Sequence, residues 1–220
     1  MTKKFIVVAG NIGVGKSTLV EMLCSRLQYQ PFYEPVTENP YLTDFYRQMD
    51  AWSFHSQVFF LAHRLQLHQE VVRFPSSSIQ DRSIYEDAEI FARNLFLQGH
   101  FSQRDFETYS SLYLSITGML QPPDLVIYLK ASEDTLLKRI SMRGRDYERK
   151  ISREYLSQLN TLYAHWIEGF TLCPVLTVPA DNLDYVSQPL HLDLVAQKVE
   201  QKLTGKDEVV FSDQEVNGYK

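Results

Sequence analysis

Gly10-Asn11-Ile12-Gly13-Val14-Gly15-Lys16-Ser17 fits the pattern G-x-x-x-x-G-K-[ST] of a phosphate-binding loop. The apolar run Phe5–Ala9 precedes it as a predicted strand, and apolar residues at helical spacing follow it from Leu19 to Leu27. Glycines let the backbone wrap around a phosphate, so that N–H groups and the helix N-terminus point at the anion. Lys16 adds a mobile positive charge for the β- and γ-phosphates, and the Ser17 hydroxyl is able to hold Mg²⁺. A glycine-rich turn with an incidental lysine would not require strand, loop and helix in this order. The segment therefore predicts a nucleotide-binding protein.

Composition narrows the class of protein. The 220 residues suit one domain, and 44% hydrophobic with 22% charged residues is ordinary for a soluble globular chain. A net charge of −5 argues against a nucleic-acid binder, so local lysines and arginines must meet the charge of a nucleotide. The only cysteines, Cys24 and Cys173, form no C-x-x-C motif, which fits a reducing cytosol and offers no thiolate metal site. No apolar run reaches about 18 residues and the chain runs directly into its first strand, so we expect a cytoplasmic protein without membrane span or signal peptide.

The remaining pattern alternates short apolar strands with helices. Expected strands cover 30–33, 79–81, 125–129 and 174–178, and expected helices cover 39–50, 52–73, 86–97, 102–119, a segment from about 131, 152–169 and 191–203. This alternation predicts an α/β protein of the three-layer P-loop NTPase type, with a parallel five-stranded sheet covered by helices on both faces. We expect one domain over residues 1–204, followed by a disordered polar tail at 205–220.

Polar residues follow three of the predicted strands, where the ligand of a parallel sheet lies. Glu34 is the candidate base for the proton of an acceptor hydroxyl, with a solvated turn glutamate as the alternative. Asp81 is placed to orient a metal through water, while Arg82 faces a phosphate or the 5′ oxygen; a capped strand–helix turn is the alternative. Together with the phosphate loop these residues provide what phosphoryl transfer to a hydroxyl needs.

The densest charge cluster of the chain lies between Arg143 and Lys150. Such a cluster is usually a solvated face. Because it follows a helix and contains Gly144, we interpret it as a mobile arginine-rich lid over ATP. Arg139 lies one turn before Arg143 and faces the same side of that helix.

Together these segments resemble the deoxynucleoside kinase family, the group of deoxycytidine, deoxyguanosine and deoxyadenosine kinases. The resemblance extends over about residues 3–200. It is carried by Gly10–Thr18, Tyr33-Glu34-Pro35-Val36, Trp52-Ser53-Phe54 with Gln57, Asp81-Arg82-Ser83 and Arg143-Gly144-Arg145.

The resemblance implies a role for each matching position. Glu34 would accept the proton of the nucleoside 5′-hydroxyl beside Arg82, and Asp81 would be the metal-side acid, which is glutamate in many relatives. The other implied positions are Gln57 pairing with the base, Phe91 stacked on it, Tyr46 and Glu148 holding the sugar 3′-hydroxyl, Arg139, Arg143 and Arg145 in the lid, and Asp184 and Tyr185 beside the adenine of ATP. Without the resemblance, Phe91 and Tyr46 would be interpreted as core residues on apolar helix stripes, whereas a buried Gln57 would still need hydrogen-bond partners.

Base preference depends on Arg64 and Asp87. Arg64 lies two turns after Gln57, and Asp87 lies one turn before Phe91. In family members that take purines or cytosine, this pair lies at the far edge of the base. There the carboxylate of Asp87 would accept from an exocyclic amine that thymine lacks, and Arg64 would donate to a purine N7 or O6; a helix–helix salt bridge is the alternative. The pair predicts preference for deoxyadenosine, then deoxyguanosine, with deoxycytidine accepted and thymidine poor.

The expected function is transfer of the ATP γ-phosphate, with Mg²⁺, to the 5′-hydroxyl of a deoxynucleoside. One alternative is a thymidylate-type kinase, which usually places an arginine where Tyr33 stands in this chain. The other is a non-catalytic nucleotide-binding subunit, in which base, acid or lid would have decayed. The resemblance also implies a homodimer or a pairing with a related subunit through long helices, for which the stripes of Trp52–Arg73 and Ser102–Met119 are candidates.

Overall fold

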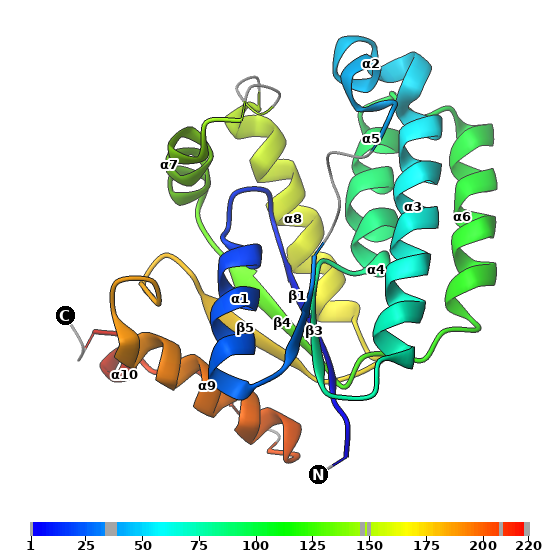
Figure 1. Ribbon diagram of the computed structural model, residues 1–220. Coiled ribbons are helices and arrows are strands. Elements are labelled where there is room, and N and C mark those ends of the chain that lie inside the picture. The colour runs from blue at the N-terminus through cyan, green and yellow to red at the C-terminus, as the bar shows by residue number, and fades with distance from the viewer. Residues whose placement is uncertain (1, 34–38, 146–147, 149–150, 207–208, 218–220) are drawn as a thin grey trace.

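A single parallel sheet forms the centre of the molecule (Figure 1). The structure, a computed structural model, describes residues 2–33, 39–145, 148, 151–206 and 209–217. The strands are β1 (Phe5–Gly10), β2 (Gln30–Phe32), β3 (Ser78–Asp81), β4 (Leu125–Lys130) and β5 (Val175–Pro179). Their order is β2-β3-β1-β4-β5, and every neighbouring pair is parallel. The predicted five-stranded α/β architecture is therefore confirmed.

Helices connect the strands and cover both faces of the sheet. Their bounds are α1 (Lys16–Leu27), α2 (Leu42–Arg47), α3 (Met49–Arg73), α4 (Ile84–Glu86), η2 (Asp87–Ala92), α5 (Arg93–Leu97), α6 (Gln103–Thr117), α7 (Glu133–Arg143), α8 (Arg153–Gly169), α9 (Pro189–Leu203) and α10 (Asp213–Asn217). The segments α4, η2 and α5 follow one another without interruption, and η2 is a π-helical turn. The predicted helix 86–97 is therefore present, begins two residues earlier and contains a widened turn. Such turns are frequent at functional sites. None of the helices in the described ranges is long and apolar enough to cross a membrane.

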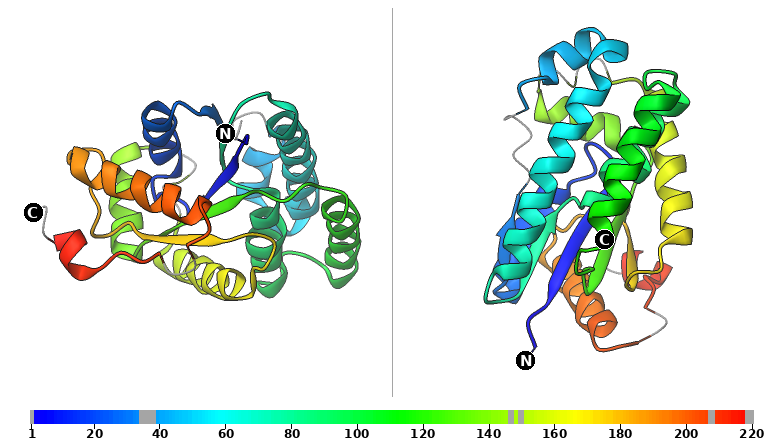
Figure 2. Two further views of the ribbon diagram at one scale, coloured as in Figure 1. Left: turned by 90° about the horizontal axis from the view of Figure 1, so that it is seen from below. Right: turned by 90° about the vertical axis from the view of Figure 1, so that its right-hand side faces the viewer.

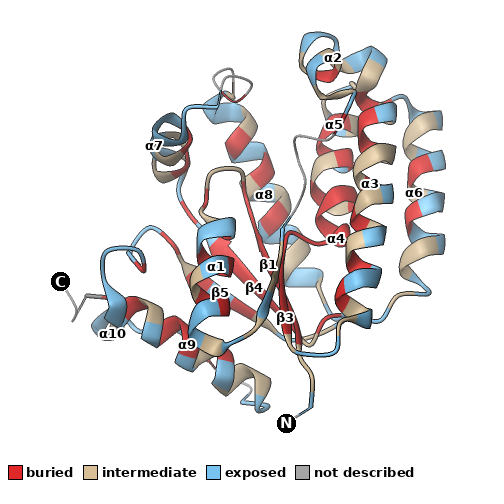
Figure 3. Cartoon of the chain, in the orientation of Figure 1, coloured by how far each residue is buried: buried red, intermediate tan, exposed pale blue. Residues whose placement is uncertain are grey.

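The period of two along β1 divides the core between the two faces of the sheet. Ile6 and Val8 pack into a cluster with α1, α7 and α9, while Phe5 and Val7 pack with α3 and α8. Figure 3 shows the buried strands between these two layers, and Figure 2 shows the layers from below and from the side. We call the face covered by α3 and α8 the second face. On it α6 packs against the outer side of α3, where Tyr109 is buried. This double cover leaves only the strand ends open to a ligand.

The C-terminal segment differs from the predicted disordered tail. Val209 and Val216 are buried in the same core cluster as α1 and α9, and α10 forms between Asp213 and Asn217. Lys198 Nζ on α9 lies 2.7 Å from Glu215 Oε1 and bonds the segment to the domain. The expectation of disorder is wrong for the described residues 209–217, because two isolated valines bury apolar surface without a periodic pattern.

Candidate active site

The phosphate loop has the geometry that its glycines predict. Gly13 and Gly15 adopt φ values of 81° and 98°, which side-chain-bearing residues rarely take. A Cβ at Gly13 would also lie 2.6 Å from Ile140 Cγ1 on α7. Lys16 begins α1, and its Nζ donates to the carbonyl oxygens of Gly10 at 2.8 Å and Asn11 at 3.0 Å. The ammonium therefore lies across the loop, where a phosphate would meet it.

Asn11 fastens the loop to α8. Its Nδ2 donates to the Leu156 carbonyl at 2.9 Å and to Asn160 Oδ1 at 2.8 Å, and its Oδ1 accepts from the Ile12 amide at 2.7 Å. A buried amide with all of these bonds has one orientation. The loop thus has a rigid support on the second face of the sheet.

Asp81 and Ser17, the two residues predicted to hold a metal, lie together in the structure. Ser17 Oγ donates to Asp81 Oδ2, and Asp81 Oδ1 is buried with no hydrogen-bond partner in the described part of the chain. Mg²⁺ is commonly bound through one or two protein oxygens together with phosphate oxygens and water. No group of three His, Cys, Asp or Glu side chains suited to a metal cage occurs within the described ranges. A carboxylate oxygen without a partner beside a hydroxyl fits such a partial coordination shell.

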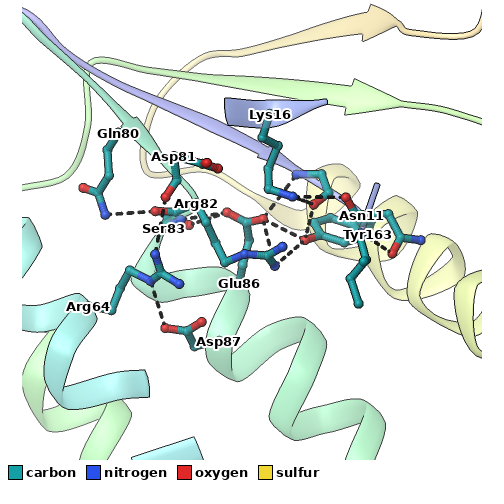
Figure 4. Close-up of polar contacts among 12 residues, drawn as sticks. Asn11, Lys16, Arg64, Gln80, Asp81, Arg82, Ser83, Glu86, Asp87 and Tyr163 are labelled. Atoms are coloured by element: carbon teal, nitrogen blue, oxygen red, sulfur yellow. Dashed lines mark hydrogen bonds and ion pairs between the residues drawn. The ribbon is translucent and has the colours of Figure 1, made fainter. Parts of the chain in front are cut away.

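Arg82 lies beside this pair in an unusual backbone conformation, with φ at 66°. Its guanidinium carbon lies 4.4 Å from the centre of the Phe91 ring, and its Nη1 donates to Tyr163 Oη at 3.2 Å. The same nitrogen lies 3.8 Å from Glu86 Oε1 (Figure 4). An aromatic face and a carboxylate thus hold the cation at the end of β3.

Glu86 is a buried residue beside the phosphate loop that the sequence analysis missed. It is fully buried; its Oε1 accepts from the Gly10 amide at 3.2 Å, and its Oε2 accepts from the Ser83 amide at 2.8 Å. Tyr163 Oη lies 2.7 Å from Oε1 and 2.9 Å from the Gly10 carbonyl. Ser83 and Glu86 form a capping box at the start of α4. The spacing S-x-x-E was the available signal for Glu86, whereas Tyr163 had none.

A cavity of about 310 Å³ extends from this polar end toward the helices of the second face. Five of the residues predicted to bind the nucleoside line it together with Arg82: Tyr46, Gln57, Asp87, Phe91 and Glu148. Tyr155 completes the wall; burial raises the pKa of its hydroxyl to about 12, so it remains protonated at neutral pH. The structure therefore brings together residues from positions 46 to 148 around one apolar space with polar groups at both ends.

Among the predicted nucleoside residues that the structure describes, Arg64 is the exception, because it does not line the cavity. It lies behind Asp87, and Arg64 Nε donates to Asp87 Oδ2 at 3.2 Å. The two side chains are 2% and 5% exposed. Arg64 Nη1 also donates to the Asp81 carbonyl at 3.3 Å. The pair is thus both a buried salt bridge and, through Asp87, a wall of the cavity.

A second hollow lies on the other side of the phosphate loop and is bordered by Thr18, Arg139, Asp184 and Tyr185. Asp184 Oδ1 accepts from the amides of Val186 and Ser187, and the Ser187 amide lowers the pKa of this carboxyl. Tyr185 is buried, and a Cβ at Gly15 would lie 3.0 Å from its hydroxyl. The predicted adenine-side residues therefore border a second hollow, which shares Gly13, Lys16 and Ser17 with the first cavity.

The arginines expected in the lid divide into two groups. Arg139 Nη1 donates to the Val14 carbonyl at 2.6 Å and Nη2 to the Ala180 carbonyl at 2.9 Å, so it braces the loop. Arg143 Nε donates to Glu148 Oε2 at 3.0 Å, and Arg145 Nη1 lies 3.6 Å from Glu148 Oε1. Arg143 and Arg145 border both cavities. Glu34, the predicted base, lies outside the described residues, as do the other residues of the cluster at 146, 147, 149 and 150.

Comparison with known proteins agrees with this geometry. The family model "Deoxynucleoside kinase" matches residues 6–204. The deoxyadenosine/deoxycytidine kinase of Bacillus subtilis is 39% identical over 88% of this chain and 90% of its own length. The deoxyguanosine kinase of the same organism is 36% identical over 91% of this chain and 98% of its own. The structure of deoxyadenosine kinase from M. mycoides with bound dATP superposes with a TM-score of 0.79 at 30% identity, over 90% of this chain and 99% of that one. The chain belongs to the deoxynucleoside kinase family.

Proposed function

We propose that this kinase transfers the γ-phosphate of ATP to the 5′-hydroxyl of a deoxynucleoside, with a preference for purines. The observation that carries the proposal is the shared border of the two hollows. Lys16, Ser17 and the two lid arginines line both the cavity containing Gln57 and the hollow containing Asp184. A phosphate held at this border lies between a base-sized apolar space and a site for the donor. Such positioning supplies most of the catalysis in phosphoryl transfer.

We assign the proton acceptor to Glu34 on the register of the sheet. Phe32 at the end of β2 pairs with Gln80 on β3, and Glu34 and Arg82 each follow two residues later. Parallel strands end at one edge, so this register supports a base and a cation near the acceptor oxygen. Arg82, Arg143 and Lys16 would then stabilise the charge that develops on the transferred phosphoryl group.

Magnesium is the cofactor that the donor set favours. The free Asp81 oxygen and the Ser17 hydroxyl are hard oxygen ligands, and the phosphates of ATP would supply others. Bound there, the ion would neutralise phosphate charge. Asp81 and Ser17 would hold the ion beside the phosphate loop.

The expected discrimination against thymidine rests on Asp87. Its carboxylate lines the cavity and forms a buried ion pair with the guanidinium of Arg64. An ionised carboxylate accepts hydrogen bonds only, so it favours a base with an exocyclic amine over thymine, which presents a carbonyl. The kinases of B. subtilis and M. mycoides described above carry deoxyadenosine, deoxycytidine or deoxyguanosine in their names, which supports the same group of substrates.

The direct test measures ATP consumption with deoxyadenosine, thymidine and dTMP offered separately. We expect the highest kcat/KM with deoxyadenosine; a preference for dTMP would instead identify a thymidylate-type kinase. Lys16→Ala should abolish turnover, and ATP binding without turnover on any nucleoside would identify a non-catalytic subunit. Glu34→Gln should lower kcat by ~10²–10⁴-fold with little change in nucleoside affinity. Glu21→Gln on the exposed side of α1 is the matched control. A Glu34→Gln enzyme with normal kcat would contradict the base assignment.

We also propose that the protein is a cytoplasmic homodimer. The stripe predicted on α3 is largely used inside the domain, where Leu61 and Val71 are buried. Exposed leucines remain on α6, at Leu114, and at the end of α5, at Leu97. Light scattering of the wild type, Leu97→Glu and Leu114→Glu should show which face pairs. A monomeric wild type at micromolar concentration would refute the dimer.

A further inference from the structure

We propose that Gln80 is a positioning residue for phosphoryl transfer, because it holds the strained Arg82 turn in place. The inference rests on the proposed role of Arg82 at the transferred phosphate. Gln80 is on β3, is fully buried and lines neither cavity. Nothing in the sequence pattern distinguished it from a core strand position.

The turn after β3 stores backbone strain. Arg82 and Gln28 are the two non-glycine residues with positive φ in the part of the chain that the structure describes. For residues with a Cβ this left-handed conformation is disfavoured and persists only where the surroundings fix it. Gln28 lies at the surface end of α1, whereas Arg82 lies at the cavity. The strained position therefore coincides with the proposed reaction site.

Every backbone polar group of the two peptide groups that flank Arg82 has a hydrogen-bond partner, and Figure 4 shows those of them that involve the side chains of Arg64, Gln80 and Glu86. On the first peptide group, the Asp81 carbonyl accepts from Arg64 Nη1 at 3.3 Å, and the Arg82 amide donates to the Val8 carbonyl at 3.0 Å. On the second, the Arg82 carbonyl accepts from Gln80 Nε2 at 2.9 Å, and the Ser83 amide donates to Glu86 Oε2 at 2.8 Å. Four bonds on two successive peptide groups leave little freedom for φ and ψ of Arg82.

Three side chains hold the turn, namely Arg64, Gln80 and Glu86. Within the described residues, the side chain of Gln80 makes only the bond to the turn. Arg64 also pairs with Asp87, and Glu86 also binds Gly10. The Gln80 amide group must face the Arg82 carbonyl, since that oxygen accepts only, and Gln80 Oε1 is left buried without a hydrogen bond in the described ranges. A buried orphan acceptor is a cost for the fold. An apolar residue at position 80 would remove this orphan oxygen but would leave the Arg82 carbonyl without its donor, which points to the donated bond as the function of the glutamine.

Loss of this bond should move the Arg82 side chain. With its carbonyl no longer held, Arg82 can relax toward the extended region, and its guanidinium would leave its place over Phe91 and beside Glu86. Misplacement of a catalytic group by about 1 Å can cost on the order of 10²-fold in rate. The nucleoside-binding residues Gln57 and Asp87 lie on other elements, so nucleoside affinity should change little.

Gln80→Met tests the proposal, because methionine keeps the length of the side chain and removes both the donor and the orphan acceptor. We expect kcat to fall about ten- to a hundredfold, while the calorimetric Kd for the nucleoside changes less than threefold and the urea midpoint moves little. Ile79→Val on the same strand is the control for ordinary core loss, since it lowers stability and leaves the turn intact. We expect its kcat to match the wild type.

Arg82→Met separates this inference from the proposed function. If Arg82→Met lowers kcat and Gln80→Met does not, Gln80 is not a positioning residue and the inference is overturned. If Arg82→Met itself leaves kcat unchanged, the role of Arg82 in the reaction is refuted, and the inference with it. An equal fall in kcat for Gln80→Met and Ile79→Val would also overturn the inference, because the effect would then be general loosening of the strand.

Discussion

The Arg64–Asp87 pair offers the sharpest test of substrate choice, because its two interpretations predict different results. Asp87→Ala removes the carboxylate from the cavity wall and from the buried ion pair with Arg64. Breaking a buried pair in this way costs about 3–5 kcal/mol of the free energy of unfolding. Arg64→Met together with Asp87→Ala removes both charges, so most of that loss should be recovered. The double variant should retain a lower kcat, because the Asp81 carbonyl loses its donor.

The effect on specificity is read as a ratio within each variant. An unpaired buried acceptor or donor costs about 1–3 kcal/mol, which corresponds to roughly ten- to a hundredfold in kcat/KM. The deoxyadenosine-to-thymidine ratio of kcat/KM should therefore fall by that factor in Asp87→Ala and in the double variant. A smaller fraction of folded enzyme lowers kcat/KM by the same factor for both substrates, so it does not change the ratio.

The assay is urea unfolding and steady-state kinetics on the wild type, Asp87→Ala, Arg64→Met and the double variant, which together form a double-mutant cycle. Asp124→Ala is the control, because it breaks a half-exposed pair with Lys4 at the opposite end of the sheet. It should reduce stability slightly and leave the substrate ratio unchanged. If Asp87→Ala is destabilised while the ratio stays within threefold of the wild type, the pair is only a helix–helix salt bridge and the argument for purine preference is refuted.

Three further predictions concern the lid, a buried histidine and the C-terminal segment. Arg143→Ala should lower kcat more than it raises the KM for ATP, because a lid cation acts on transition-state charge; a change in KM alone would indicate a binding face. Burial lowers the pKa of His68, whose Nε2 donates to the Gln121 carbonyl, so wild-type stability should fall as pH drops below 6.5. In urea unfolding between pH 8 and 5.5, His68→Gln should show a flatter dependence, and an unchanged slope would contradict this. The bond from Lys198 lowers the pKa of Glu215 to about 2. The contribution of Glu215 to the free energy of unfolding is therefore present above pH 4.5 and is lost as pH falls toward 2. Removal of residues 205–220 should cost about 2–4 kcal/mol in urea unfolding at pH 7 without changing kcat; an unchanged midpoint would refute the packing of the segment.

The sequence was informative wherever one local pattern carried the signal. A strand, a glycine-rich loop and a helix in direct succession defined the phosphate loop, and the alternation of elements defined the sheet. The strand-end rule then brought Asp81 and Arg82 to the edge beside Ser17 without any knowledge of distances. Physical reasoning from local pattern was sufficient for these features because parallel sheets place their ligands at one edge.

The sequence was not informative about the buried polar network. Glu86 and Tyr163 are 77 residues apart, and their bond to each other leaves no periodic mark in the chain. Arg64 is two turns from Gln57, yet it lies behind the cavity wall, because the direction of a long side chain depends on what packs over α3. The C-terminal segment was misjudged for the related reason that Val209 and Val216 bury apolar surface one residue at a time.

One buried carboxylate connects the two halves of the site. Glu86 accepts from the amide of Gly10 in the phosphate loop with one oxygen and from the amide of Ser83 in the Arg82 turn with the other. A carboxylate is suited to this because both oxygens accept, whereas an amide would turn its NH₂ group toward one of the donors. The same charge lies 3.8 Å from Arg82 Nη1, which compensates it and fixes the arginine at the cavity. From a position that lines neither cavity, Glu86 thus connects the phosphate loop to the Arg82 turn, and the nearby guanidinium offsets part of the cost of burying its carboxylate.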